Sequence, residues 1–237
     1  MSFLILVRHG QSIWNLQNRF TGWVDVELTK KGESEAEKAG LLIKEKNIEI
    51  NHYYTSLQSR ANNTLKIIQK ILNDNKEFLR AWQLNERHYG ALTGLNKIEV
   101  SKKIGEDKVH EFRRSWEMKP DKLTKNSPYH PINIETYKDI PKEIIPDTES
   151  LKDTYERVIK YFDDEIKKKL ENKNILISAH GNSIRALCKK LFDLDNNQIS
   201  SLEIPTGNPL IIEFNKNSNI TKCEYLDKER AKNLVAF

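Results

Sequence analysis

Two short, mostly apolar segments lie near opposite ends of the chain, and a His-Gly pair follows each; the first, residues 3–7, is an unbroken apolar run. Residues 3–7 lead into Arg8-His9-Gly10, and residues 174–179 lead into His180-Gly181. An apolar run of this length that ends in a glycine turn is typical of a strand buried on both faces of a parallel sheet. Binding crevices of open α/β sheets lie outside the carboxyl ends of the strands. If the two strands are neighbours, His9 and His180 therefore face each other across one pocket.

The pattern between and after these runs alternates between helical and strand periods. Apolar residues at helical spacing predict a helix that Thr29 caps and that extends to about Lys46, and a second helix that Ser56 caps. A capping-box pattern at Ser150 predicts a long helix with an apolar stripe as far as Leu170. Strands are predicted at residues 52–55, 78–82, 209–214 and 221–226. The order of these elements predicts a three-layer α/β/α sandwich with a mostly parallel sheet.

The segment from about residue 83 to 146 has a looser pattern and contains five prolines. Short helices are predicted near 97–104 and 106–116. The segment is too long for an ordinary connection, and long insertions of this kind are commonly functional. We interpret it as a subdomain that covers the strand-end crevice, within a single domain of residues 1–237. The charged tail after Asp227 is expected to be mobile.

Composition narrows the class of protein. Hydrophobic residues make up 38% and charged residues 31% of the 237 residues, no apolar run approaches the length of a membrane helix, and no signal-peptide pattern opens the chain. The two cysteines favour a reducing compartment, so we expect a cytoplasmic protein. A net charge of +5 suits either nucleic acid or a small anionic substrate, but no nucleic-acid-binding motif and no metal-ligand spacing occur. We therefore expect an anionic small molecule as the partner, and no nucleic acid, membrane or metal.

Taken together, the two His-Gly segments and six further blocks resemble the histidine phosphatase superfamily and, within it, the cofactor-dependent phosphoglycerate mutase family. The first segment reads Leu6-Val7-Arg8-His9-Gly10-Gln11-Ser12 with Trp14-Asn15. The other blocks are Phe20-Thr21-Gly22-Trp23-Val24-Asp25, Leu84-Asn85-Glu86-Arg87-His88-Tyr89-Gly90, Gly94-Leu95-Asn96-Lys97, Arg113-Arg114-Ser115, Glu149-Ser150-Leu151-Lys152-Asp153-Thr154 and Ile204-Pro205-Thr206-Gly207. The resemblance implies a sheet with one antiparallel strand and a homodimer or homotetramer.

The resemblance also implies an activity. Members of the family interconvert 3-phosphoglycerate and 2-phosphoglycerate, a glycolytic step, through a phosphohistidine that 2,3-bisphosphoglycerate primes. His9 corresponds to the nucleophile, since a neutral imidazole can attack phosphorus and divide one difficult transfer into two easier ones. Glu86 corresponds to the general acid and base, because the substrate hydroxyl must lose a proton as it takes phosphate and regain one as it leaves.

The remaining site residues follow from the same resemblance. Arg8, Arg60 and His180 are expected to surround the transferring phosphoryl group, whose negative charge they stabilise. The residues expected to bind substrate are Arg8, Ser12, Asn15, Thr21, Gly22, Arg60, Glu86, Arg87, His88, Tyr89, Lys97, Arg113, Arg114, Gly181 and Asn182.

Three other functions fit parts of the sequence. A phosphatase on the same scaffold would use water as the acceptor, but the blocks around Glu86, Lys97 and Arg113 favour a phosphoglycerate. A bisphosphoglycerate synthase tends to carry glycine where Ser12 stands. A non-catalytic phospho-ligand-binding module would have lost His9 or Glu86, and both are present.

Overall fold

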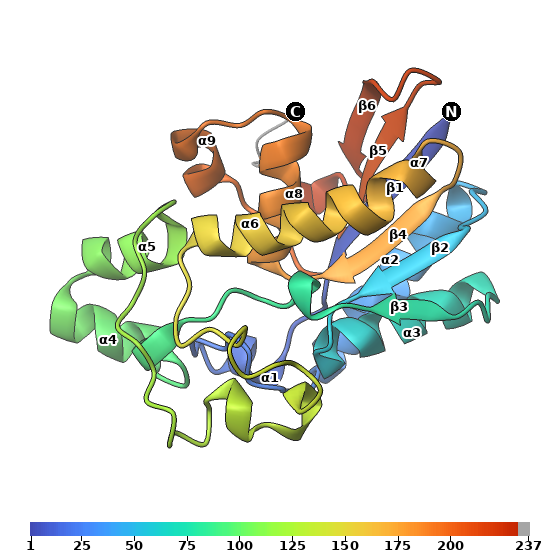
Figure 1. Ribbon diagram of the computed structural model, residues 1–237. Coiled ribbons are helices and arrows are strands. Elements are labelled where there is room, and N and C mark those ends of the chain that lie inside the picture. Colours follow the sequence, from blue (N-terminus) through green and yellow to red (C-terminus); the bar gives the residue numbers. More distant parts are fainter. Residues whose placement is uncertain (232–237) are drawn as a thin grey trace.

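We describe the fold from a computed structural model, which places residues 1–231 (Figure 1). The strands are β1 (Ser2–Arg8), β2 (His52–Thr55), β3 (Phe78–Arg80), β4 (Ile175–Ala179), β5 (Leu210–Phe214) and β6 (Ile220–Tyr225). The α-helices are α1 (Ile13–Leu16), α2 (Lys30–Glu45), α3 (Ser59–Leu72), α4 (Lys97–Ile104), α5 (Glu106–Arg114), α6 (Leu151–Tyr161), α7 (Lys167–Leu170), α8 (Gly181–Leu191) and α9 (Asn196–Ser201). Short 3₁₀ turns lie at Trp82–Leu84, Gly90–Leu92, Pro131–Asn133, Glu135–Tyr137 and Glu229–Ala231. The expectation of a mobile tail falls mainly on residues 232–237, which lie outside the described residues.

The described strands form one sheet in the order β3-β2-β4-β1-β5-β6. β1, β2, β3 and β4 run parallel, whereas β5 runs antiparallel to both of its neighbours, β1 and β6. The predicted sheet, mostly parallel with one reversed strand, is confirmed. β1 pairs directly with β4, so the two His-Gly segments are neighbours, as expected.

Both faces of the sheet are buried at the central strands β1 and β4, which explains why these two strands are rich in apolar residues. In β1, Leu4 and Leu6 pack into the hydrophobic core on one face, and Ile5 and Val7 pack into the core on the other. Each of these four side chains is at most 1% exposed. Successive side chains of a strand point to opposite faces, so a strand covered on both sides needs apolar residues at every position.

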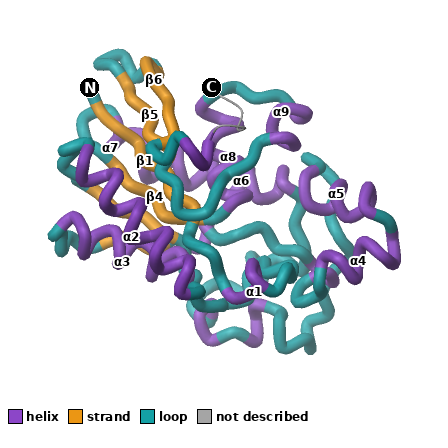
Figure 2. The backbone as a smooth tube through the Cα atoms, turned by 180° about the vertical axis from the view of Figure 1, so that it is seen from behind, coloured by secondary structure: helices purple, strands orange, loops and turns teal. Residues whose placement is uncertain are grey.

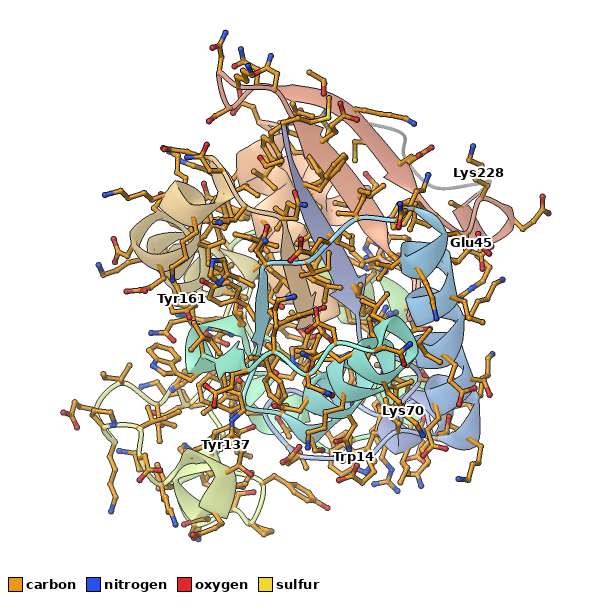
Figure 3. All side chains as sticks on the ribbon, turned by 90° about the vertical axis from the view of Figure 1, so that its right-hand side faces the viewer. Trp14, Glu45, Lys70, Tyr137, Tyr161 and Lys228 are labelled. Atoms are coloured by element: carbon orange, nitrogen blue, oxygen red, sulfur yellow. The ribbon has the colours of Figure 1, made fainter. Side chains whose placement is uncertain are left out.

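Helices cover the two faces and complete the three predicted layers. α6 and α8 supply the core on the Leu4 face, and α2 and α3 supply the core on the Ile5 face. Figure 1 shows α6 in front of the strands, and the reverse view in Figure 2 brings α2 and α3 forward. In Figure 3, Tyr161 of α6 and Glu45 of α2 lie on opposite sides of the strands.

The apolar stripe predicted after Ser150 continues to Leu170, but the helix is not regular throughout. The capping box at Ser150 is present, and a π-helical stretch, Phe162–Ile166, joins α6 to α7. A π turn holds more residues than an α turn. The wider turn keeps Phe162, Ile166 and Leu170, spaced four apart, on the buried face, where each is at most 5% exposed.

Two predicted boundaries were wrong. The helix expected to start at Ser56 begins at Ser59, because the Ser56 hydroxyl turns toward His180, where its oxygen also accepts a hydrogen bond from the Gln58 amide. The strand expected over 78–82 ends at Arg80, and a 3₁₀ turn takes the chain away from the sheet. Thr29, by contrast, caps α2 as predicted.

Residues 83–146 contain α4, α5 and short 3₁₀ turns but no strand. Figure 1 shows α4 and α5 beyond the end of the sheet toward which β4 points. Two small apolar clusters anchor this segment, one around Trp23 with Tyr137 and one around Phe20 with Val100. The Phe20–Asp25 block therefore anchors residues 83–146 through the side chains of Phe20 and Trp23.

Candidate active site

The paired ends of β1 and β4 bring two histidines together. Arg8 of β1 lies opposite Ala179 of β4, and the backbone N–H of His9 donates to the carbonyl of Ala179 at 3.0 Å. The rings of His9 and His180 consequently lie with centroids 5.0 Å apart and planes inclined by 60°. Residue 10 is glycine because the backbone of Gly32 approaches it closely: a Cβ at residue 10 would lie 2.1 Å from the carbonyl oxygen of Gly32.

His9 is held in one tautomer and kept uncharged. Its Nδ1 lies 2.7 Å from the carbonyl oxygen of Gly10, which can only accept, so Nδ1 carries the proton and Nε2 keeps its lone pair. Burial, together with the nearby Arg60 and Arg8 guanidinium groups, holds the pKa of His9 well below its usual value. Nε2 makes no hydrogen bond within residues 1–231, and His9 borders the pocket described below. These properties suit an attacking nitrogen.

His180 is also buried and uncharged, for the same reasons. Burial and the charge of Arg60 hold the pKa of His180 well below its usual value. Its Nε2 lies 2.8 Å from the Ser56 hydroxyl, and its Nδ1 is buried with no partner in the described part of the chain. A buried nitrogen without a partner is costly, so a ligand that reached this atom would relieve the cost.

Two arginines supply positive charge beside the histidines. Arg8 donates through Nη1 to the carbonyl of Ile204 at 2.7 Å, and Arg60 donates to the carbonyls of Val24 at 2.9 Å and Gly22 at 3.0 Å. Carbonyls orient the guanidinium groups without neutralising them. The Nε of each arginine is buried and has no partner among residues 1–231. Burial lowers the pKa of both arginines, so an anion between them would be strongly favoured.

Glu86 stands at the same pocket with one oxygen occupied and one free. Its Oε1 accepts hydrogen bonds from the backbone N–H of Arg87 at 2.7 Å and from Nδ2 of Asn182 at 2.8 Å. Its Oε2 accepts none from the described residues, and a Cβ added to Gly181 would lie 3.8 Å from it. The side chain is 8% exposed. Neutral donors thus fix the carboxylate and leave Oε2 able to exchange a proton with a ligand.

These groups border one strongly cationic pocket at the carboxyl end of the sheet. Seven arginine or lysine side chains but only two glutamates line it. The lining residues are Arg8, His9, Asn15, Arg19, Thr21, Gly22, Arg60, Glu86, Tyr89, Lys97, Arg113, Arg114, Gly181, Asn182, Arg185, Glu203 and Ile204. Such a surplus of positive charge matches a ligand that carries two or more negative groups.

The cations over the pocket mouth come from α4 and α5. Burial, together with the positive charges of Arg113 and Arg8, lowers the pKa of Lys97 to about 8. Arg114 contacts the carboxylate of Glu203 and donates to the carbonyl of Leu202. The adjacent residues Arg113 and Arg114, both expected to bind substrate, border the pocket.

Four of the expected site residues do not line the pocket. His180 is fully buried beside His9, and Ser12 caps α1 and is also fully buried. Arg87 donates to the backbone carbonyls of Glu149 and Met118, with a buried Nη1 left unpartnered, and Nδ1 of His88 accepts from the Gly90 amide. Burial lowers the pKa of His88 to about 4.

Sequence reasoning missed four lining residues, namely Arg19, Arg185, Glu203 and Ile204. Arg185 could have been found, because it lies one helical turn after Asn182 on α8 and therefore shares its face. It donates to Oδ1 of Asn182 at 2.8 Å, which directs the Asn182 amide nitrogen toward Glu86. Burial lowers the pKa of Arg185 to about 9.

Within residues 1–231, no group of three or more histidine, cysteine, aspartate or glutamate side chains is arranged to hold a metal ion. No helix in the same part of the chain is long and apolar enough to cross a membrane.

Comparison with known sequences identifies the class of protein. The family model of the histidine phosphatase superfamily (branch 1) matches residues 4–130 and 116–224. The chain therefore belongs to the histidine phosphatase superfamily. It is 67% identical, over the full length of both chains, to a 2,3-bisphosphoglycerate-dependent phosphoglycerate mutase of Pelagibacter ubique (strain HTCC1062). It is 50% identical to a protein of the same name from Borreliella burgdorferi (strain ZS7), over 95% of this chain and 92% of the relative. Within the superfamily, the chain belongs to the phosphoglycerate mutase family.

Solved structures share the fold at low sequence identity. The structure titled Mycobacterial hydrolase 1 superimposes with a TM-score of 0.71 at 18% identity, over 95% of this chain and 97% of that chain. Bacillus stearothermophilus YhfR superimposes with a TM-score of 0.69 at 22% identity, over 93% and 95%. These likenesses support the three-layer architecture.

Proposed function

We propose that the protein interconverts 3-phosphoglycerate and 2-phosphoglycerate through a phosphohistidine at His9, primed by 2,3-bisphosphoglycerate. One observation carries the proposal: a single cationic pocket contains both an uncharged imidazole with a free Nε2 and a carboxylate with a free Oε2. The relatives at 67% and 50% identity are both named 2,3-bisphosphoglycerate-dependent phosphoglycerate mutase, which supports the choice of substrate.

His9, Glu86 and the cationic side chains have different roles in the proposed phosphoryl transfer. The Nε2 lone pair of His9 attacks phosphorus, the P–N bond forms, and the P–O bond of the donor breaks. Glu86 gives its proton to the departing hydroxyl oxygen, and in the reverse direction it removes the proton of the attacking hydroxyl. Arg8, Arg60 and Nδ1 of His180 surround the phosphoryl group and stabilise its charge.

The pocket fits a bisphosphorylated cofactor. Three buried atoms without partners in residues 1–231, Nε of Arg8, Nε of Arg60 and Nδ1 of His180, would be satisfied by the oxygens of one phosphate group. Lys97, Arg113 and Arg114 supply the charge for a second anionic group on the covering side. When bound, 2,3-bisphosphoglycerate supplies the phosphoryl group that primes His9. Residues 83–146 would then act as a cover over the reacting groups.

We also propose that the protein forms a homo-oligomer and is cytoplasmic. The resemblance favours a homodimer or homotetramer, and β3 offers an edge strand whose Leu79 is 51% exposed. We place the protein in the cytoplasm, in keeping with a glycolytic reaction and two free cysteines.

The decisive experiment measures conversion of 3-phosphoglycerate to 2-phosphoglycerate with and without 2,3-bisphosphoglycerate. Conversion should require priming and survive EDTA, because arginines supply the positive charge. Release of glycerate and phosphate as the main products would identify a phosphatase instead. Activity lost in EDTA and restored by a divalent ion would refute the metal-free mechanism. His9→Ala should take up no acid-labile phosphate, and stoichiometric uptake by that variant would exclude His9 as the nucleophile.

A further inference from the structure

Arg157 of α6 lies outside the pocket, yet it holds the backbone that carries Glu86. Its Nη1 donates to the carbonyls of Gln83 at 2.6 Å and Asn85 at 3.0 Å, and its Nη2 donates to the carbonyl of Glu86 at 3.0 Å. Its Nε and Nη2 also donate to the two carboxylate oxygens of Glu149, at 2.6 Å and 2.9 Å. A guanidinium has five N–H groups, so these five acceptors use all of them.

The backbone around Glu86, which Arg157 holds, belongs to no helix or strand that could support it. After the 3₁₀ turn Trp82–Leu84 the chain runs without helix or strand as far as Gly90. Buried carbonyls require partners, and a single guanidinium satisfies those of residues 83, 85 and 86. The amide of Glu86 is held separately, by Oε1 of Gln58 at 2.9 Å. Both backbone polar groups of Glu86 are therefore fixed by side chains from other elements.

Glu149 forms a salt bridge with Arg157 and neutralises the charge of its guanidinium group. The Arg157 side chain is 9% exposed and that of Glu149 is 4% exposed. A buried charge is tolerated when it is paired and fully hydrogen-bonded. Oε2 of Glu149 also accepts from the backbone N–H of His88 at 2.7 Å. The pair thus holds the chain on both sides of Glu86.

We propose that Arg157, supported by Glu149, is a positioning residue that sets Glu86 for proton transfer, an inference that rests on the proposed role of Glu86. This role requires the planar guanidinium group of Arg157. A lysine keeps the charge but has only three N–H groups around one nitrogen and cannot reach three carbonyls and a carboxylate together. Loss of the guanidinium group would release the backbone of residues 83–86 and move Oε2 of Glu86 relative to the substrate hydroxyl. Misplacement of about 1 Å can cost about 10²-fold in rate.

The test compares Arg157→Lys and Arg157→Met with Glu86→Gln in two reactions. The first is turnover of 3-phosphoglycerate, which needs proton transfer. The second is phosphorylation of His9 by 4-nitrophenyl phosphate: the P–N bond forms, and nitrophenolate leaves with the electron pair as a stable anion that needs no proton. We expect turnover to fall about 10- to 100-fold in the Arg157 variants. Phosphorylation of His9 and the Kd for 3-phosphoglycerate should stay within about threefold, far less than that loss.

Lys160→Met is the matched control, since Lys160 lies one turn further along α6 in solvent, and its one ion pair within residues 1–231 is with Asp164. It should change neither reaction. Turnover in the Arg157 variants within threefold of wild type would overturn the inference. So would an equal loss of both reactions, or failure of both variants to fold at the assay temperature, because either result means a purely structural role. If Glu86→Gln itself keeps full turnover, the proposed role of Glu86 fails instead.

Discussion

The rings of His9 and His180 lie 5.0 Å apart, and within residues 1–231 neither is hydrogen-bonded to a carboxylate. In a serine-protease triad, an aspartate stabilises the imidazolium that forms during the reaction. Here a carbonyl and a hydroxyl take that place, and two arginines oppose a positive charge on either ring. The site is thus built for two neutral histidines and an anionic ligand.

Folding stability should decrease as the pH falls below about 6.5, the ordinary pKa of histidine. Both buried rings have lowered pKa values in the folded protein, so the unfolded chain binds more protons below that pH. Each ring then contributes a loss of up to about 1.4 kcal/mol per pH unit. Urea unfolding between pH 5 and 7.5, without phosphate, measures the slope. His180→Asn should make the slope shallower, and an unchanged slope would mean that His180 is not held neutral.

Substrate capture should weaken as the pH rises through about 8. The pKa of Lys97 is lowered to about 8, so above this pH the free enzyme loses a positive charge from its pocket. If that charge is needed, kcat/KM should fall by up to about tenfold per pH unit. Lys97→Arg keeps its charge at high pH, so its kcat/KM should fall less than that of the wild type between pH 8 and 9. A profile that declines equally in both proteins would assign the titration to another group.

Glu86→Gln should lose turnover and keep binding. Glutamine retains the oxygen that accepts from Arg87 and Asn182 but cannot carry a proton, so turnover should fall about 10²–10⁴-fold. The melting temperature and the Kd for 3-phosphoglycerate should change little, because Arg8, Arg60, Asn15 and His180 remain. Turnover within about threefold of wild type, well short of that loss, would show that a group other than Glu86 moves the proton.

Gly32→Ala should disturb the loop that carries His9. A Cβ at Gly32 would lie 2.1 Å from the carbonyl oxygen of Gln11, a backbone atom that no side-chain rotation can move away. Alanine favours a helix over glycine by about 1 kcal/mol, but overpacking costs about 1–3 kcal/mol. We expect a lower melting temperature, by roughly 2–4 °C per kcal/mol lost, together with reduced turnover. Lys31→Ala, at the exposed neighbouring position, is the control; equal melting temperatures for the two variants would show that the loop can yield.

Much of the fold could be predicted because its determinants are local. The apolar run of β1 shows burial on both faces, and the caps at Thr29 and Ser150 are single-residue signals. The start of α3 was mispredicted because Ser56 and Gln58 hydrogen-bond to distant residues instead of serving the helix. Gln58 bonds to the carbonyl of Gly22 and to the amide of Glu86, and no periodicity in the sequence reveals such contacts.

Contacts between distant segments also limited what the sequence could predict about the active site. Residues within contiguous motifs, such as His9 and Glu86, could be named from sequence. Arg157 and Glu149 could not be placed behind Glu86, since their contacts join segments more than 60 residues apart. Arg19 and Glu203 lie in irregular segments, where no pattern tells which side chain turns inward.

The position of β1 in the sheet has a consequence for synthesis on the ribosome. Its two neighbours, β4 and β5, are the fourth and fifth strands along the chain. At roughly 5–20 residues per second, the first strand waits on the order of ten seconds before Ile175–Ala179 is translated. During that time an apolar segment with free backbone groups has no native partner. The two histidines therefore cannot meet until β4 has been translated, although β1 is the first strand to leave the ribosome.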